Sequence, residues 1–142
     1  MSSPSGAPKI RKKKKKNEWS EETHIAPITS LEFHNKSLYV GYKNGLLRQF
    51  ELSNGEISFE YDGHLGSITS IKLSDTELFS GSKDATVRVW NKTSGASQGQ
   101  MDTSAPVLDM ALNYKDDAFN KNVNQNSLFA ACEDANIMDI SP

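Results

Sequence analysis

The stretch SGSKDATVRVWN, residues 80–91, joins two short runs of β-type residues through a tight turn and ends beside a tryptophan. Taken alone, the turn acid Asp84, the serines and Trp90 could form a chemical site. Forty residues earlier the chain contains VGYKNGLLRQFE, residues 40–51, with glycine, lysine and arginine at the same spacing. Recurrence at a fixed offset indicates a repeated structural unit.

The repeat extends well beyond this stretch. HIAPITSLEFHNKSLYVGYKNGLLRQFELSNG begins at His24, and HLGSITSIKLSDTELFSGSKDATVRVWNKTSG begins at His64, with no gap between the two copies when they are aligned. A third and weaker copy consists of APVLDMAL (105–112) and SLFAACEDANIMDI (127–140). The polar, asparagine-rich residues 113–126 separate its two halves and are typical of an exposed loop.

Each copy has the pattern of strands and not of helices. ITSLEF and ITSIKL alternate apolar and polar residues, as half-buried strands do. Short runs rich in apolar and β-branched residues follow, and turn residues separate them, with Asn44-Gly45 the clearest hairpin signal. EISFEY and ASQGQM supply weaker fourth strands. Four short antiparallel strands in about 40 residues predict one propeller blade.

Residues 24–140 therefore resemble the WD-repeat β-propellers. The second copy carries the resemblance most clearly, because Gly63-His64 opens it and Val89-Trp90 closes it. The usual Trp-Asp pair is Trp90-Asn91 here, and the first and third copies have Phe50-Glu51 and Ile140-Ser141 in its place.

The resemblance implies an all-β fold, a partial β-propeller of about three four-stranded antiparallel blades with a disordered basic N-terminal tail. The expected domains are the tail, residues 1–17, and a blade region, residues 18–142. The blades are expected at about 24–63, 64–103 and 104–142, the last of them incomplete.

The resemblance also implies a structural hydrogen-bond network in the second blade. In this family a loop histidine, a strand hydroxyl, the turn aspartate and the tryptophan form a chain, which maps here to His64, Ser80 or Ser82, Asp84 and Trp90. Buried polar groups need such partners. The first copy retains His24 but has Asn44 and Phe50, and the third has Asp134 without a matching histidine or tryptophan. Because related positions recur in the other copies as parts of the repeated fold, we interpret the network as a structural one that holds the blade together, and not as a catalytic site.

A closed propeller usually needs four to eight blades, and this sequence predicts about three. Three hypotheses stay open: a fragment of a longer propeller, a propeller completed by another chain or another copy, and an open three-blade domain. Asp139 occupies the position of Val89 in the second copy, which predicts that the C-terminal edge frays first.

The predicted function is a non-enzymatic protein–protein interaction scaffold, part of a larger and possibly nuclear complex. The sequence predicts no catalytic, cofactor-binding or metal site, no cofactor and no membrane segment. The family's geometry puts the inter-blade loops and the turns after the second strands on one face, which can bind proteins of unidentified kind. For each candidate there, simple solvation is an equally good interpretation; the candidates are Lys43, Lys83, Pro27, Ser67 and Glu133.

The N-terminal tail is the one strongly basic segment. Residues 1–17 carry seven cationic side chains and no acid, whereas the remaining residues carry nine basic and eighteen acidic side chains. Such a run favours nuclear import or phosphate contact, with a solubilising role as the alternative. It suggests a nuclear and otherwise a cytoplasmic location, and an alternative function as an RNA-associated nuclear or nucleolar particle subunit. The cations are Lys9, Arg11, Lys12, Lys13, Lys14, Lys15 and Lys16.

Overall fold

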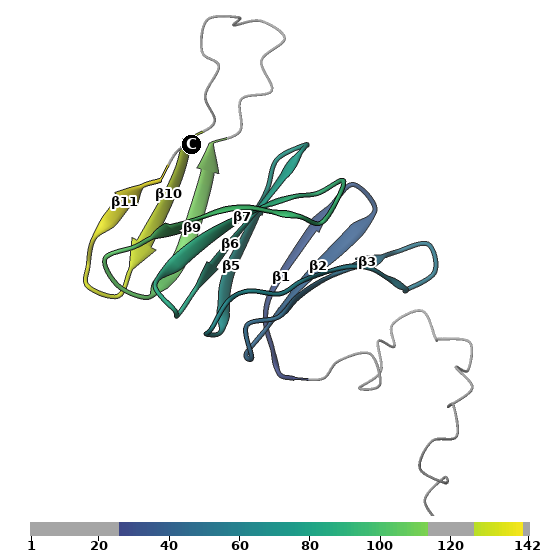
Figure 1. Cartoon of the computed structure of the whole chain (residues 1–142), viewed down its shortest axis with the longest axis horizontal. Coiled ribbons are helices and arrows are strands. Elements are labelled where there is room, and N and C mark those ends of the chain that lie inside the picture. Colours follow the sequence, from purple (N-terminus) through teal and green to yellow (C-terminus); the bar gives the residue numbers. More distant parts are fainter. Residues whose placement is uncertain (1–25, 114–126, 141–142) are drawn as a thin grey trace, which may run out of the picture.

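The computed structural model describes residues 26–113 and 127–140, and it contains only β-strands there (Figure 1). The strands form three antiparallel sheets, two of four strands and one of three. No helix in the described ranges is long and apolar enough to cross a membrane. The predicted all-β, propeller-type fold is confirmed. The predicted basic tail lies outside the described residues.

Each sheet is one blade, and its strands follow one another in chain order. Blade 1 consists of β1 (Ile28–His34), β2 (Ser37–Tyr42), β3 (Leu47–Glu51) and β4 (Ile57–Tyr61). Blade 2 consists of β5 (Ile68–Leu73), β6 (Glu77–Ser82), β7 (Thr86–Asn91) and β8 (Ser97–Asp102). Blade 3 consists of β9 (Val107–Asn113), β10 (Ser127–Cys132) and β11 (Ile137–Asp139).

The turn between the second and third strands has the same construction in every blade. Its third residue has a positive φ: 90° at Gly45, 62° at Ala85 and 67° at Ala135. The residue before it caps the turn, because the side-chain oxygens of Asn44, Asp84 and Asp134 accept the backbone N–H two positions later. Asn and Asp favour such turns for this reason. The repeat seen in the sequence is thus a repeat of hydrogen bonds.

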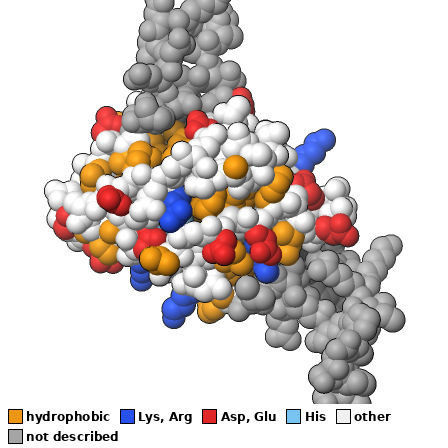
Figure 2. Space-filling view, in the orientation of Figure 1, with side chains coloured by type: hydrophobic (Ala, Val, Ile, Leu, Met, Phe, Trp, Pro, Cys, Tyr) orange, Lys and Arg blue, Asp and Glu red, His pale blue; other side chains and the backbone are white. Residues whose placement is uncertain are grey.

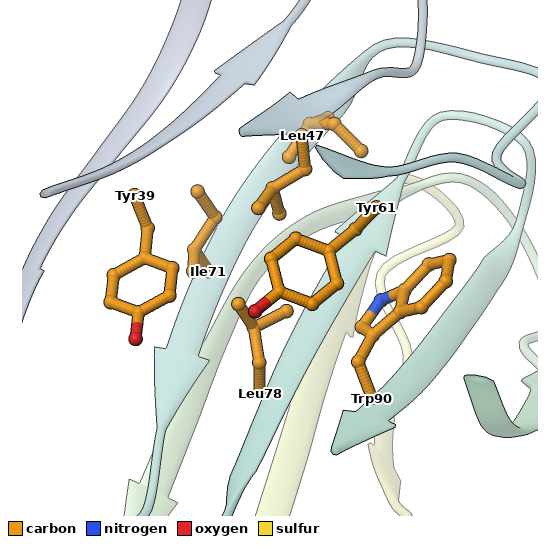
Figure 3. Packing of buried hydrophobic residues seen from close by; sticks show 7 residues of the cluster. Tyr39, Leu47, Tyr61, Ile71, Leu78 and Trp90 are labelled. Atoms are coloured by element: carbon orange, nitrogen blue, oxygen red, sulfur yellow. The ribbon is translucent and has the colours of Figure 1, made fainter. Parts of the chain in front are cut away.

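The hydrophobic core lies between the blades. The first cluster joins Tyr39, Leu47 and Tyr61 of blade 1 to Ile68, Ile71, Leu78 and Trp90 of blade 2 (Figure 3). Phe59 and Leu73 pack at its margin. Tyr61 meets Trp90 edge to face, with ring centroids 5.5 Å apart. The second cluster joins Phe79 and Val87 of blade 2 to Val107, Met110, Leu128, Ala130 and Ile140 of blade 3.

The innermost strands β1, β5 and β9 lie side by side and bring the blades into face-to-face contact (Figure 1). A third buried cluster, Val40, Tyr42 and Phe50, lies on the other side of blade 1 with Ala26, Leu38 and Leu46. Burial of apolar side chains between sheets is the main stabilising contribution in this kind of fold. Each blade is therefore held mainly by its neighbours.

Candidate functional site

The predicted network residues of blade 2 are brought together by hydrogen bonds. His64 Nδ1 lies 2.9 Å from Asp84 Oδ2, and His64 Nε2 lies 2.7 Å from Ser80 Oγ. The Trp90 indole Nε1–H donates to the same Ser80 oxygen at 2.9 Å. These contacts tie the loop before β5, strand β6, the β6–β7 turn and strand β7 to one another.

The donors and acceptors define one direction for the chain of protons. Burial favours a neutral imidazole, and the Asp84 carboxylate, which only accepts, places the imidazole proton on Nδ1. Nε2 then accepts the Ser80 hydroxyl proton, while Ser80 Oγ accepts from Trp90. Thr86 Oγ1–H and the Leu65 backbone N–H also donate to that carboxylate. The arrangement thus combines a neutral imidazole with an ionised Asp84.

The net pKa shifts of His64 and Asp84 agree with this proton arrangement. Burial lowers the pKa of His64 below 6.5, although its bond to Asp84 opposes the shift. Burial tends to raise the pKa of Asp84, but the bonds from Thr86, His64 and the Leu65 N–H outweigh it and hold that pKa below 3.8. Both shifts stabilise the pair found here.

Ser82 has a different task from Ser80. Its hydroxyl donates to the Gly66 carbonyl at 2.9 Å and accepts the Asp84 backbone N–H at 3.1 Å. It therefore holds the loop before β5 against the β6–β7 turn and does not touch His64 or Trp90 in any described hydrogen bond. Of the two serines considered from the sequence, Ser80 links the histidine to the tryptophan.

Thr86 is a network member that sequence reasoning missed. It is 8% exposed, donates to Asp84 and lies 3.2 Å from His64 Nδ1. Its equivalent in the first copy is Leu46, so the repeat comparison offered no signal for it. A hydroxyl two residues after a turn aspartate was the available local signal.

Blade 1 has its own buried polar network at a different place. The Tyr61 hydroxyl donates to Gln49 Oε1 at 2.8 Å, and Gln49 Nε2 donates to Ser37 Oγ at 3.1 Å and to the Glu51 carboxylate. Ser37 also donates to Glu51. Burial raises the pKa of Tyr61 well above its usual value of 10.0, so the phenol stays protonated and donates. None of these residues was predicted, because the second copy has Val89 where Gln49 stands.

Blade 3 replaces the network with apolar packing. Ile140 stands at the Trp90 position, is 6% exposed and belongs to the cluster with Phe79 and Val107. Asp134 is exposed and accepts from the Asn136 backbone and side chain, so it caps its own turn. Cys132 is buried and carries a free thiol.

The candidate partner-binding residues lie at one end of the blades, here called the turn face. The backbone N–H of Lys43 donates to the Pro27 carbonyl at 2.8 Å, and that of Lys83 donates to Ser67 at 3.0 Å. Glu133 makes the same bond to Pro106 in blade 3. Lys43, Lys83, Glu133 and Pro27 are exposed, and Ser67 is half-buried.

Leu65 is a further member of the turn face that the sequence did not reveal. Its side chain is 94% exposed, the largest fraction among the exposed large apolar residues described. Its backbone N–H donates to Asp84 Oδ2 at 2.9 Å. A Cβ added to Gly45 of blade 1 would lie 2.4 Å from the His64 carbonyl oxygen, so the loop of Leu65 packs tightly against the neighbouring turn.

The His64–Asp84 pair is enclosed and not open to a substrate, because the two side chains are only 1% and 12% exposed. Among residues 26–113 and 127–140, no group of three or more His, Cys, Asp or Glu could hold a metal ion. The lysine run of residues 9–16 lies outside the described residues.

Comparisons with known proteins place the fold. The WD40 family model (WD domain, G-beta repeat) matches residues 55–91, which include β4 to β7. A search of curated proteins found no match to this chain.

Solved structures extend the similarity to most of the chain. Saccharomyces cerevisiae Sqt1 is 16% identical, with a TM-score of 0.72 over 81% of this chain and 31% of its own. The β-propeller domain of Myceliophteria thermophila Cps50 (Swd1) is 21% identical, with a TM-score of 0.69 over 82% of this chain and 36% of its own. The WD40 β-propeller domain of Doa1 is 18% identical, with a TM-score of 0.68 over 84% and 38%. The chain thus spans about a third of the length of these structures.

Proposed function

We propose that this chain, which carries a WD40 repeat within β-propeller blades, is a non-enzymatic scaffold whose turn face binds partner proteins. WD40 propellers generally act as protein-interaction scaffolds. The observation that carries the proposal here is Leu65, an apolar side chain 94% exposed on a loop that hydrogen bonds hold in place.

The loop of Leu65 is organised before any partner arrives. Asp84 accepts its N–H, Ser82 donates to the Gly66 carbonyl, and Gly45 of blade 1 allows the neighbouring turn to approach closely. A rigid apolar anchor loses little conformational freedom on binding, which increases affinity. The buried network of blade 2 therefore positions a binding residue, although it takes no part in chemistry.

Lys43 and Lys83 add positive charge to this face. Each is exposed and follows the second strand of its blade, and the loop that carries Leu65 packs against both turns. The face shown in Figure 2 carries Lys and Arg side chains as well as acidic ones, scattered between apolar patches. We propose a partner surface with an apolar pocket for Leu65 and carboxylates opposite the lysines, because complementary charge increases the rate and specificity of association.

Charge and size changes at the turn face test this function. Proteins that co-purify with the wild type are identified, purified singly and titrated against Leu65→Asp, Lys43→Glu and Lys83→Glu. We expect Leu65→Asp to weaken a true partner at least about tenfold, as loss of an interface anchor does. Lys36→Glu is the matched control, because the β1–β2 turn lies at the other end of blade 1. Equal affinity of all four variants and the wild type would rule out the turn face.

We also propose that the lysine run directs the chain to the nucleus as part of a larger complex. Its support is the block KIRKKKKK, residues 9–16, in a sequence that is otherwise acidic. Replacing Lys12–Lys16 with alanine in a fluorescent fusion should move the signal out of the nucleus. An unchanged distribution of the fluorescent fusion between nucleus and cytoplasm would contradict this proposal.

The alternative function is an RNA-associated particle subunit that uses the same run on phosphate. Seven cations without an interleaved aromatic residue favour phosphate contact over base stacking. RNA affinity should then fall steeply between 50 and 200 mM salt, where about 6–10 phosphate contacts cost 10³–10⁵ in affinity. Deletion of residues 9–16 should abolish it. A protein partner bound at the turn face would tolerate that deletion, so the two functions are distinguishable.

Finally, we propose that the blades form part of a larger or incomplete propeller. Apolar side chains on both end blades are exposed, among them Leu31 at 58% and Ile137 at 77%. Solution mass and heat-induced unfolding of the 142-residue chain test this proposal. Aggregation or a non-cooperative melt supports an incomplete unit, whereas a cooperatively melting monomer contradicts it.

A further inference from the structure

A lysine side chain joins blades 1 and 2 at the end opposite the turn face. The Lys92 ammonium lies 2.9 Å from His34 Nδ1 and donates to the Ser74 carbonyl oxygen at 2.9 Å. His34 ends strand β1 of blade 1, whereas Ser74 and Lys92 directly follow strands β5 and β7 of blade 2. We call His34, Ser74 and Lys92 the lysine bridge.

Blade 2 holds its part of the lysine bridge in place through backbone hydrogen bonds. The Lys92 N–H donates to the Thr76 carbonyl at 3.0 Å, so Lys92 lies beside the β5–β6 turn. Ser74, which is 2% exposed, organises that turn, because its N–H donates to the Glu77 carbonyl and its hydroxyl accepts the Glu77 N–H, both at 3.0 Å. The ammonium therefore extends to His34 from an ordered part of blade 2.

The contact determines the protonation state of His34. An ammonium has donors and no acceptor, so Nδ1 must accept from Lys92, and the proton of the neutral imidazole lies on Nε2. A protonated imidazole has no lone pair to offer and would place a second positive charge beside the ammonium. The lysine bridge is therefore made only by neutral His34.

Charged groups of both blades act on this imidazole. Burial and the Lys92 ammonium lower the pKa of His34 below 6.5, although the carboxylates of Asp75 and Glu32 oppose the shift. Asp75 lies in the β5–β6 turn, and Glu32 lies in β1, 4.0 Å from the Lys72 ammonium of β5. The neutral form of His34 is thus favoured in spite of two nearby acids.

The side-chain contact of the lysine bridge is not part of the repeated blade structure. At the 40-residue offset Lys92 corresponds to Leu52 in blade 1, and His34 corresponds to Ser74 in blade 2. Leu52 repeats the backbone hydrogen bond across its turn, but its side chain is 44% exposed. A blade therefore forms without this lysine, and the bridge is an addition at the contact between blades 1 and 2.

We propose that the lysine bridge is an acid-sensitive connection between blades 1 and 2, made while His34 is neutral and broken when His34 binds a proton. Protonation removes the acceptor of the ammonium and brings two positive charges together. The Ser74 carbonyl keeps the ammonium on blade 2, so blade 1 loses the contact. The hydrophobic cluster between the blades remains, and the end opposite the turn face opens more readily.

NMR titration of the His34 ring in the full chain is the first test. Lys92→Met, which keeps the aliphatic chain, should raise the midpoint towards 6.5, because the repulsion by the ammonium is lost. Asp75→Asn should lower the midpoint, because a carboxylate that favours the charged imidazole is lost. Lys36→Met is the matched control: it removes an exposed lysine two residues from His34 that does not contact the ring in any described hydrogen bond, and it should shift the midpoint less than Lys92→Met.

A double-mutant cycle of His34→Ala and Lys92→Met measures the contact itself. Unfolding in urea is followed at one pH above 6.5 and at one below the measured midpoint of His34. At the higher pH the coupling should change the unfolding equilibrium constant at least about twofold, as a hydrogen bond between side chains does. At the lower pH the coupling should vanish or change sign.

Two results would overturn the inference. Equal His34 midpoints in the wild type and Lys92→Met would show that the ammonium does not act on the ring. A coupling of the same sign and size at both pH values would show that the contact does not depend on the charge of His34. Neither result depends on partner binding, so the test is independent of the turn face.

Discussion

At the scale of single residues, the chain from Trp90 through Ser80 and His64 to Asp84 is a one-way series of hydrogen bonds. Each member donates to the next, and the last is a carboxylate that also accepts from Thr86 and Leu65. Because the side chains of Trp90, Ser80, His64 and Thr86 are buried and that of Asp84 is only 12% exposed, each of these polar groups depends on its neighbour for a hydrogen bond. Removal of one member therefore leaves others unpaired.

Ser80→Ala tests this dependence. The change leaves the Trp90 indole N–H and the His64 Nε2 atom buried without the Ser80 hydroxyl that both contact. An unsatisfied buried polar group costs about 1–3 kcal/mol. We therefore expect the free energy of unfolding in urea to fall by about that amount, with an unchanged m-value. Ser97→Ala, on the exposed strand β8, is the control and should stay within about 0.5 kcal/mol. A loss for Ser80→Ala no larger than for the control would contradict the proposed role.

The pH dependence of stability follows from the same residues. The pKa of His64 is lowered from 6.5, so the unfolded chain binds more protons than the folded chain once the pH falls below about 6.5. The contribution of His64 is fully present above that pH and is lost on acidification towards its folded-state pKa. Asp84, whose pKa lies below 3.8, adds a second loss at lower pH.

NMR measurement of the His64 ring resonances against pH checks the sign directly. The imidazole should titrate with a midpoint below 6.5, and Ser80→Ala should alter that midpoint because the hydroxyl no longer donates to Nε2. His34 is the internal comparison: burial and the nearby Lys92 ammonium also lower its pKa, but no serine contacts it in the described hydrogen bonds. A midpoint for His64 above 6.5 would refute the neutral-imidazole assignment.

At the scale of strands and turns, small backbone details decide how the blades fit. Ala85 and Ala135 adopt positive φ values of 62° and 67° in turns where blade 1 uses glycine. A left-handed conformation disfavours residues with a Cβ, but the capping side chains of Asp84 and Asp134 hold these turns in place. The glycines within β2 and β6 act differently, since they remove atoms from the contact with the next blade.

Gly81→Ala measures the steric requirement at the contact of blades 2 and 3. The added Cβ would lie 2.8 Å from Val107 Cγ1, and overpacking of this kind costs about 1–3 kcal/mol. In a Val107→Ala background the same change should cost less, because Cγ1 is absent. A double-mutant cycle in urea gives the coupling. Additive effects would show that the two residues do not meet as described.

At the scale of the whole molecule, the blades form a row in which blade 2 alone has described neighbours packed on both faces. Blade 1 and blade 3 each bury one face against it and leave apolar residues exposed on the other, including Phe33 and Ile137. In such repeat arrays stability is roughly a sum of repeat and interface contributions. The ends of the row should therefore open before the middle.

Hydrogen exchange measured by NMR can locate this opening. Among the described strands β11 pairs with β10 alone, and it is three residues long. We expect its amides to exchange faster than the amides of β7, which lies between β6 and β8. Faster exchange in β7 than in β11 would indicate that stability is distributed in another way.

The sequence predicted the features that repeat and missed those that do not. The 40-residue offset led to the blades and to the turns at Lys43 and Lys83, and the family resemblance led to the partners His64 and Trp90. Thr86 and Gln49 were not predicted because the aligned residue in the other copy is apolar, Leu46 for Thr86 and Val89 for Gln49. The repeat therefore marked neither position. The exposure of Leu65 depends on how the loop of one blade meets the turn of the next, which is a tertiary property. The predicted weakness of the C-terminal edge stays a prediction, although Asp139 is indeed solvent-exposed.

The order of the strands has a consequence for how quickly the chain can fold. Within every sheet each strand pairs with its neighbour in the sequence, and none waits for a distant segment. Closing short loops costs little entropy, and folds made of local pairings form quickly. The hairpins of blade 2 can therefore close early, but the blade becomes stable only when the blades at either side pack on its two faces.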